Sequence, residues 1–288
     1  MEFLITFVNG LSLGGIYAMI ALGYTMVYGI AKMLNFAHGD IIMVGGYTIL
    51  VFLAINPVAA IIAAVIFCML MGIVIEKVAY KPLRGASPLA VLITAIGVSY
   101  LLQSIAQMAF GSAPKFVIIA NLGTIKIGDL AIGYSTIITL ACSLVIMIGL
   151  NLFVKFSKTG RAMIAVSEDK GAAQLMGINV NQIITITFAI GSALAALAGL
   201  FFLLKAPTIN PTFGALPGIK AFTAAVIGGI GSIPGAMIGG ILLGVIECFA
   251  QSVPEIAPYT DAIEFAILIV LLLVRPTGLL GKKRREKV

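Results

Sequence analysis

Long apolar runs, separated by short polar segments, occupy most of the 288-residue chain. The runs are continuously apolar and do not alternate with polar residues, which favours helices over the strands of a membrane barrel. A helix needs roughly 20 apolar residues to cross the hydrocarbon core, and most runs approach that length. The pattern predicts an all-α polytopic membrane protein with about eight or nine transmembrane helices in one domain, 1–288. The runs cover residues 3–30, 41–55, 57–76, 88–110, 135–154, 182–204, 221–230, 234–251 and 261–274.

Three of these runs are short or interrupted. The run 41–55 would be about 22 Å long as a helix, which is less than the roughly 30 Å of the hydrocarbon core. The runs 221–230 and 234–251 are separated only by a glycine-rich turn. Short or broken helices at membrane depth are tolerated where protein or an aqueous cavity covers them. We therefore expect these segments to line a path through the membrane.

Composition excludes a soluble domain. Hydrophobic residues make up 61% of the chain and charged residues 10%, and a soluble globule of this size cannot hide so much apolar surface. The start of the chain has no basic region and no small-residue cleavage site, so the first run is expected to be a retained span. Cys68, Cys142 and Cys248 lie in apolar runs, where they are expected to be buried hydrophobes, neither disulfides nor metal ligands.

The net charge of +7 is concentrated at the C-terminus, where residues 282–288 carry five Lys or Arg residues against Glu286. A basic tail directly after a span is typical of a cytoplasmic anchor that faces anionic lipid, so nucleic-acid binding is not expected. The tail, 276–288, is therefore placed on the cytoplasmic side.

Alternating the spans backward from this tail predicts the orientation of the whole chain. Fourteen of the 18 Lys and Arg residues then fall on the inner side, as the positive-inside rule requires. The N-terminus lies outside and the C-terminus in the cytoplasm. The inner set outside the tail is Lys32, Lys77, Lys81, Arg84, Lys155, Lys158, Arg161, Lys170 and Arg275. The outer side holds Lys115, Lys126, Lys205, Lys220, Glu255, Asp261 and Glu264.

Two connections are long enough to have structure of their own. The outer loop, 111–134, contains β-branched and glycine residues at 115–119 and 123–128, which predict a small β-hairpin. The inner connection, 156–181, is polar and of helical length.

The inner connection has the signals of a short amphipathic helix. Ser167 is a candidate N-cap, with Glu168 and Asp169 in the first helical turn, where the helix dipole favours acids. Ala172 and Ala173, followed by Leu175 and Met176, supply an apolar face, and Gly177 is suited to end the helix. Such a helix suits docking into a groove of another protein, and equally suits lying on the bilayer surface.

Several segments resemble one family of transport proteins. Glu168, the pair Ala172-Ala173 and Gly177-Ile178 resemble the coupling-helix loop of ABC importer permeases, although Glu168 is separated from the alanine pair and no Leu-Pro follows. Four further blocks resemble the LivH-type permease of high-affinity branched-chain amino acid importers, over about residues 9–281. The blocks are Gly14–Thr25, Leu34–Asp40, Gly228–Ala236 and Arg275–Leu279.

The resemblance implies a subunit of a larger assembly in the bacterial cytoplasmic membrane. In such importers a second permease subunit, usually LivM-like, completes the path for leucine, isoleucine or valine. Two cytoplasmic ATP-binding subunits hydrolyse ATP with Mg, and an extracellular or periplasmic binding protein delivers the substrate. The 156–181 segment would then couple this chain to the ATPases. The chain itself is expected to hold no cofactor.

The block that contains Asn35, His38 and Asp40 precedes the short run 41–55. Asp40 is well placed as an N-cap, and His38 suits a hydrogen-bonded structural side chain. A second interpretation stays open, in which a helix N-terminus at this segment faces the path. Its free amides and dipole would favour a substrate carboxylate.

Small residues recur at four-residue spacing in the glycine-rich region, where they let helices approach closely in lipid. They suit helix packing within the chain, or an interface or gate between two permease subunits. The residues predicted to pack or gate are Gly228, Gly229 and the four-residue series Gly231, Gly235 and Gly239. A carboxylate inside an apolar run, such as Glu247, is costly in lipid. It either pairs with Lys205 or Lys220, or reaches the membrane interface.

Other function classes fit less well. A permease for another small solute would share the pattern, as would a secondary transporter or channel, although those two have no need of a cytoplasmic docking helix. An enzyme is not expected. The sequence contains no Gly-x4-Gly-Lys-Ser/Thr motif, so ATP hydrolysis is assigned to partner subunits.

Overall fold

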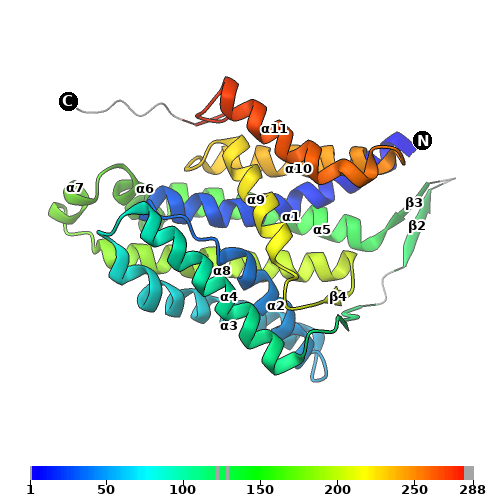
Figure 1. The fold of residues 1–288 in the computed structure, drawn as a ribbon, viewed down its shortest axis with the longest axis horizontal. Helices are drawn as coiled ribbons and strands as arrows, with labels where there is room; N and C mark the ends of the chain where they lie inside the picture. Colours follow the sequence, from blue (N-terminus) through cyan, green and yellow to red (C-terminus); the bar gives the residue numbers. More distant parts are fainter. Residues whose placement is uncertain (1, 121–122, 128–129, 282–288) are drawn as a thin grey trace.

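The computed structural model describes residues 2–120, 123–127 and 130–281, and within them the chain is mostly helical (Figure 1). Among these described residues, seven helical stretches are long and apolar enough to cross a membrane, so the chain is a multi-pass membrane protein. They are α1 (Glu2–Ala31), α3 (Pro57–Ile75, continued by a π-helical turn Glu76–Tyr80 and a 3-10 turn Lys81–Leu83), α4 (Pro88–Phe110), α5 (Tyr134–Phe156), α8 (Val180–Lys205), α10 (Ile233–Ser252) and α11 (Thr260–Val274, preceded by a 3-10 turn Ala257–Tyr259).

Two shorter apolar helices, α2 (His38–Phe52) and α9 (Ala215–Gly228), begin inside the bundle. Their starting ends touch, since a Cβ on Gly39 would lie 2.6 Å from the carbonyl oxygen of Gly214. From there they run toward opposite ends of the molecule. Tyr47 of α2 stacks on Phe110 at the end of α4, whereas α9 ends beside the first residues of α10. We call α2 and α9 half-helices because each traverses only part of the bundle.

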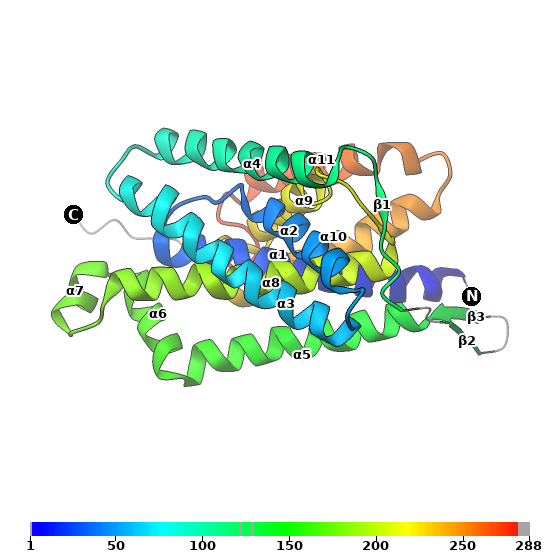
Figure 2. The same ribbon diagram turned by 90° about the horizontal axis from the view of Figure 1, so that it is seen from below.

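The helices form two units that run in opposite directions, α1–α4 and α8–α11. In the first unit a long helix is followed by an extended segment, a half-helix and two further helices, and the second unit repeats this order. The contacts repeat as well: α1 packs on α10 as α8 packs on α3, and α2 packs on α8 as α9 packs on α1. Figures 1 and 2 show α1 and α8 side by side in the centre, with α4 and α11 on one side of them. Inverted repeats of this kind are common in transporters.

Close packing in the centre depends on residues with small side chains. The α1–α10 contact brings backbones together, because a Cβ on Gly244 would lie 2.1 Å from the Gly14 nitrogen and one on Gly240 would lie 2.3 Å from the Ala18 Cα. Helices in lipid gain little from apolar burial alone, so this close approach carries much of the association. By contrast, α4 and α11 are the least buried of the seven long helices.

Short strands and helices close the two ends of the bundle. In the segment 111–134, β2 (Thr124–Ile127) pairs antiparallel with β3 (Leu130–Gly133). Lys115–Phe116 (β1) pairs instead with Thr208–Ile209 (β4). At the other end, α6 (Lys158–Glu168) and α7 (Lys170–Leu175) follow α5. The basic residues of the tail, 282–288, lie outside the described part of the chain.

Candidate functional site

The segment 32–37 returns from the end of α1 into the bundle and leads into α2. Its first residue, Lys32, has φ +61°, the left-handed conformation that often ends a helix. Asn35 is buried and accepts a 2.8 Å hydrogen bond from the Tyr80 hydroxyl in the π-helical turn. The π-helical turn therefore holds the returning segment in place.

His38 lies buried against the middle of α1. A Cβ on Gly23 would come within 2.3 Å of the imidazole Nε2, so the glycine at this position makes room for the histidine. The Tyr24 ring packs edge-on against the imidazole with centroids 4.7 Å apart. Phe36 and Phe222 extend the aromatic contact to α9, with centroids 5.3 Å apart. The two half-helices therefore meet in a largely apolar, aromatic junction.

Asp40 does not cap α2, contrary to the sequence-based expectation. Ala37 occupies the N-cap position without a side-chain hydrogen bond, and Asp40 lies in the first turn. The Asp40 carboxylate is buried and accepts a 2.8 Å hydrogen bond from the Gln103 amide of α4. The structure thus directs Asp40 toward a neighbouring helix, and the start of α2 is fixed by tertiary contacts of the returning segment.

The glycine-rich turn packs α9 against α10. A Cβ on Gly228 would lie 2.0 Å from the Gly235 carbonyl oxygen, and one on Gly239 would lie 2.1 Å from that of Ala224. Gly229 and Gly231 adopt φ +106° and +93°, which other residues rarely tolerate. These contacts all lie within this chain, and a gate between subunits stays a prediction.

The C-terminal segment docks on the same turn. The backbone nitrogens of Leu279 and Leu280 donate to the carbonyl oxygens of Ile227 and Gly228, both over 2.9 Å. Two of the sequence blocks that lie far apart in the chain, Gly228–Ala236 and Arg275–Leu279, therefore form one structural unit.

Lys220 is buried in α9 and faces three carboxylates. The sequence placed it at the edge of an outer loop, but α9 begins five residues earlier, at Ala215. Its ammonium nitrogen lies 2.9 Å from Glu247 of α10, which confirms Lys220 as the partner of Glu247. It also lies 2.7 Å from Asp261 and 3.3 Å from Glu264, both of α11. We call these four side chains the Lys220 cluster.

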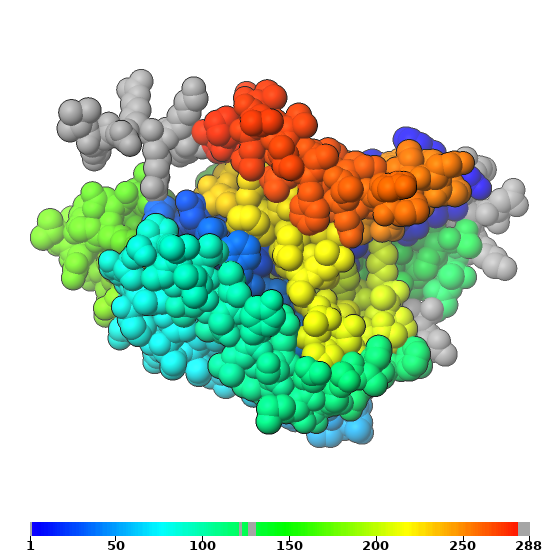
Figure 3. All heavy atoms as spheres, viewed as in Figure 1, coloured from blue at the N-terminus to red at the C-terminus, as the bar shows by residue number. Residues whose placement is uncertain are grey.

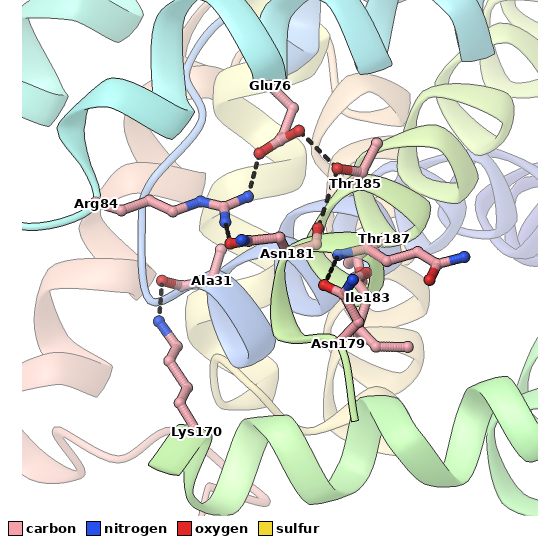
Figure 4. A network of polar contacts seen from close by, with 10 residues as sticks. Ala31, Glu76, Arg84, Lys170, Asn179, Asn181, Ile183, Thr185 and Thr187 are labelled. Atoms are coloured by element: carbon pink, nitrogen blue, oxygen red, sulfur yellow. Dashed lines mark hydrogen bonds and ion pairs between the residues drawn. The ribbon is translucent and has the colours of Figure 1, made fainter. Parts of the chain in front are cut away.

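A second polar network joins the π-helical turn after α3, the loop that follows it and the start of α8 (Figure 4). Arg84 donates to the buried Glu76 and to Asn181, and Thr185 donates to Glu76 over 2.8 Å. In the same view Lys170 of α7 donates to the last carbonyl of α1, at Ala31, over 3.0 Å. Burial, and then the positive charge of Arg84, lower the pKa of Lys170. The segment containing α7 is therefore tied directly to the end of α1.

The two helices of the 156–181 segment have caps that differ from the predicted ones. Ser157 caps α6, and Asp169 caps α7 by accepting from the Gly171 and Ala172 nitrogens over 2.8 and 3.0 Å. Ser167 is not a cap, because it lies inside α6 and donates to the Ile164 carbonyl. Glu168 is the last residue of α6 rather than part of a first turn.

The α7 end of this segment projects apolar side chains. Ala173 faces the protein, whereas Leu175 and Met176 are 91% and 82% exposed. Gly177, with φ +82°, ends the helix as the sequence predicts. An exposed apolar tip on a short helix suits docking into a groove of another protein.

An open pocket of about 610 Å³ lies beside this network. Its lining is mostly apolar with three cations, Lys32, Arg84 and Lys170. Asn35, His38 and Asp40 do not line it. In the part of the chain that the structure describes, no group of His, Cys, Asp or Glu is arranged to hold a metal.

The face between α4 and α11 presents α9 between them in the space-filling view (Figure 3). Asp40 approaches this face from α2 through Gln103, and Lys220 approaches it from α9 through Asp261 and Glu264. The sequence indicated neither arrangement. Asp40 had the signal of a cap, and Lys220 directly preceded the apolar run 221–230 and therefore resembled a loop residue.

Comparisons with known proteins agree over nearly the full length. A family model described as the permease component of branched-chain amino acid transport systems matches residues 6–272. The chain is 46% identical to the high-affinity branched-chain amino acid transport system permease protein BraD of Pseudomonas aeruginosa, over 98% of this chain and 96% of that protein. It is 42% identical to the corresponding protein LivH of Salmonella typhimurium, over 100% of this chain and 98% of that protein.

A solved structure has a similar fold. A chain of PsaBC from Streptococcus pneumoniae, in complex with Fab, superposes with a TM-score of 0.53 and 15% identity, over 96% of this chain and 93% of that chain. At that identity the likeness concerns the fold alone.

Proposed function

The chain belongs to the permease family of branched-chain amino acid transport systems, and on that premise we propose that it forms one half of an import path for leucine, isoleucine and valine. The matched relatives are named for this substrate class. The aromatic and apolar junction of the half-helices is compatible with aliphatic side chains. Substrate selection would reside largely in a separate binding protein outside the membrane.

The chain would lie in the bacterial cytoplasmic membrane with its N-terminus outside. The distribution of Lys and Arg residues supports this orientation, and it places α6, α7 and Arg275 in or near the cytoplasm. In this arrangement α2 and α9 are partial crossings. The expected eight or nine crossings then correspond to seven full spans and two half-helices.

The partners would be a second, LivM-like permease subunit, two cytoplasmic ATP-binding subunits and the external binding protein. ATP and Mg would be bound by the ATPase subunits. The sparsely buried, apolar outer surfaces of α4 and α11 are the natural candidates to face the second permease subunit.

The contact of α7 with the end of α1 carries the coupling proposal. Movement of a docked ATPase would displace α7, and Lys170 would transmit that displacement to Ala31. Ala31 directly precedes the returning segment 32–37, which leads into α2. An ATPase movement would therefore reach the half-helix junction through a continuous set of bonds.

A double substitution at the tip of α7 tests the docking surface. Leu175→Ser with Met176→Ser removes two exposed apolar side chains and should leave the fold intact, because neither packs in the core. We expect loss of ATPase co-purification and at least a tenfold loss of leucine uptake in vesicles. If α7 instead lies on the bilayer surface, the ATPase must bind another part of the chain, and transport would persist in this variant.

The matched control is Ile55→Ser, which changes an apolar residue that is 74% exposed at the opposite end of the molecule. This variant should retain both assembly and uptake. Unchanged assembly and uptake in the α7 double variant would reject the docking role.

A further inference from the structure

The Lys220 cluster contains more buried acid than buried base. Glu247 and Glu264 are 6% and 0% exposed, and Lys220 is 4% exposed. Asp261 is the outer member, with a side chain 52% exposed. The single positive charge of Lys220 cannot neutralise three ionised carboxylates, because each buried charge needs its own compensation in a region of low dielectric.

The two buried carboxyl groups are held very differently. The Oε1 of Glu247 accepts from Lys220 over 2.9 Å and from the Gln251 amide over 3.1 Å. Tyr17 of α1 lies close to this carboxyl group. Glu247 is therefore provided with the donors that an ionised carboxylate requires.

Glu264 lacks such donors. Neither of its oxygens has a conventional hydrogen bond, and its approach to the Lys220 nitrogen is 3.3 Å. The Oε2 of Glu247 is also unpartnered, and both carboxyl groups lie on the same Lys220 nitrogen, at 2.9 and 3.3 Å. Two buried carboxylates that share one lysine cannot both be ionised without strong repulsion.

The surrounding elements offer no further compensation among the described residues. Besides Tyr17 and Lys220, the groups near the pair are Cys248 of α10, Asp261 of α11 and Lys205 at the end of α8. Lys205 is exposed, and Lys220 is the cation that forms ion pairs with these acids in the described part of the chain. Among the described residues, no cluster of His, Cys, Asp or Glu side chains is arranged so that it could hold a metal ion.

We propose that Glu247 and Glu264 bind one exchangeable proton, carried by Glu264 and donated to the free Oε2 of Glu247. The proton enters from solvent past the half-exposed Asp261 and leaves by the same route, so no other reactant is consumed. Bound, it joins α11 to α10 beside Lys220 of α9. Its release leaves two adjacent carboxylates that repel each other and loosen α11. The position of α11 at the edge of the face in Figure 3 then depends on the pH at this end of the bundle.

Infrared difference spectroscopy on the full chain in lipid nanodiscs tests this proposal directly. At neutral pH we expect the C=O stretching band of a protonated carboxylic acid that shifts in D2O and disappears at alkaline pH. The band should be absent in Glu264→Gln and lost or titrated at lower pH in Glu247→Gln. The control Asp261→Asn should retain it. Absence of the band at neutral pH in the unsubstituted chain, or its persistence in both Gln variants, would overturn the proposal.

Thermal unfolding as a function of pH gives a second readout. The folded chain holds a proton that exposed carboxyl groups in the unfolded chain release at neutral pH, so the stability of the unsubstituted chain should fall as pH rises. Glu264→Gln keeps a neutral donor and should show a flatter pH dependence. Stability that follows the sodium or potassium concentration, with no dependence on pH, would assign a bound metal cation in place of the proton and reject the proposal.

Discussion

The half-helices α2 and α9 occupy equivalent places in the two inverted units, yet their polar contacts have opposite character. The buried Asp40 of α2 meets the neutral amide of Gln103 on α4. The buried Lys220 of α9 meets acids on α10 and α11. The repeat therefore determines where a polar side chain can be placed, beside α4 or beside α11, while the charge at each place is set independently. Substitutions on the two sides should differ accordingly.

Lys220→Met should have the largest effect. It leaves Glu247 and Glu264 buried without a cation, and breaking a buried pair in this way costs about 3–5 kcal/mol. We expect a strong drop in the thermal midpoint measured in nanodiscs. Lys205→Met, which changes an exposed lysine, serves as the control. A Lys220 variant as stable as this control would mean that the α9 side is no more charge-dependent than the α2 side.

Gly214→Ala tests the place where the two half-helices meet and should have an intermediate effect. The new Cβ would lie 1.9 Å from the Gly39 carbonyl oxygen. The backbone shift needed to accommodate it should destabilise the protein by about 2–3 kcal/mol. Thermal stability and uptake should both fall. Gly149→Ala in α5 meets no atom within 4 Å and should be neutral or slightly stabilising. Equal behaviour of the two variants would contradict close contact between the half-helices.

Asp40→Asn should have the smallest effect. The amide oxygen can still accept from Gln103, so we expect a loss of less than about 1 kcal/mol. Asp40→Ala removes this acceptor, leaves the Gln103 amide nitrogen with only the Ser99 hydroxyl at 3.3 Å, and costs somewhat more. Thermal unfolding of both variants measures the difference. If Asp40→Asn is as damaging as Lys220→Met, the α2 side depends on charge and the contrast between the half-helices is wrong.

Helix boundaries were predictable wherever local chemistry sets them. Asn56 and Ser87 each cap a helix that begins with proline, Pro57 for α3 and Pro88 for α4. The apolar run 88–110 coincides with α4 for the same reason. The main correction concerns the start of α2. Ala37 has no capping side chain, and the helix begins there because Tyr80 holds Asn35 in the returning segment.

The polar sites were predictable only in part. An ionisable group in an apolar run is costly without a partner. The sequence therefore indicated that Glu247 could pair with a lysine, and Lys220 was one of the two candidates. That Asp261 and Glu264 join the same lysine depends on the packing of α11 against α9 and α10, which no local pattern encodes. Ser167 had the signal of a cap, but Ser157 and Asp169 lie at the positions where α6 and α7 actually begin.

The docking of Leu279 and Leu280 on the α9–α10 turn has a consequence for biosynthesis. These residues follow α11 and are synthesised well after the turn, and their backbone nitrogens pair with carbonyls at the end of α9. During translation the carbonyl groups of Ile227 and Gly228 therefore lack these two donors until Leu279 and Leu280 have been synthesised. The helices of the second unit can enter the membrane earlier, but the hydrogen bonds at the α9–α10 turn are complete only after Leu280 has been synthesised.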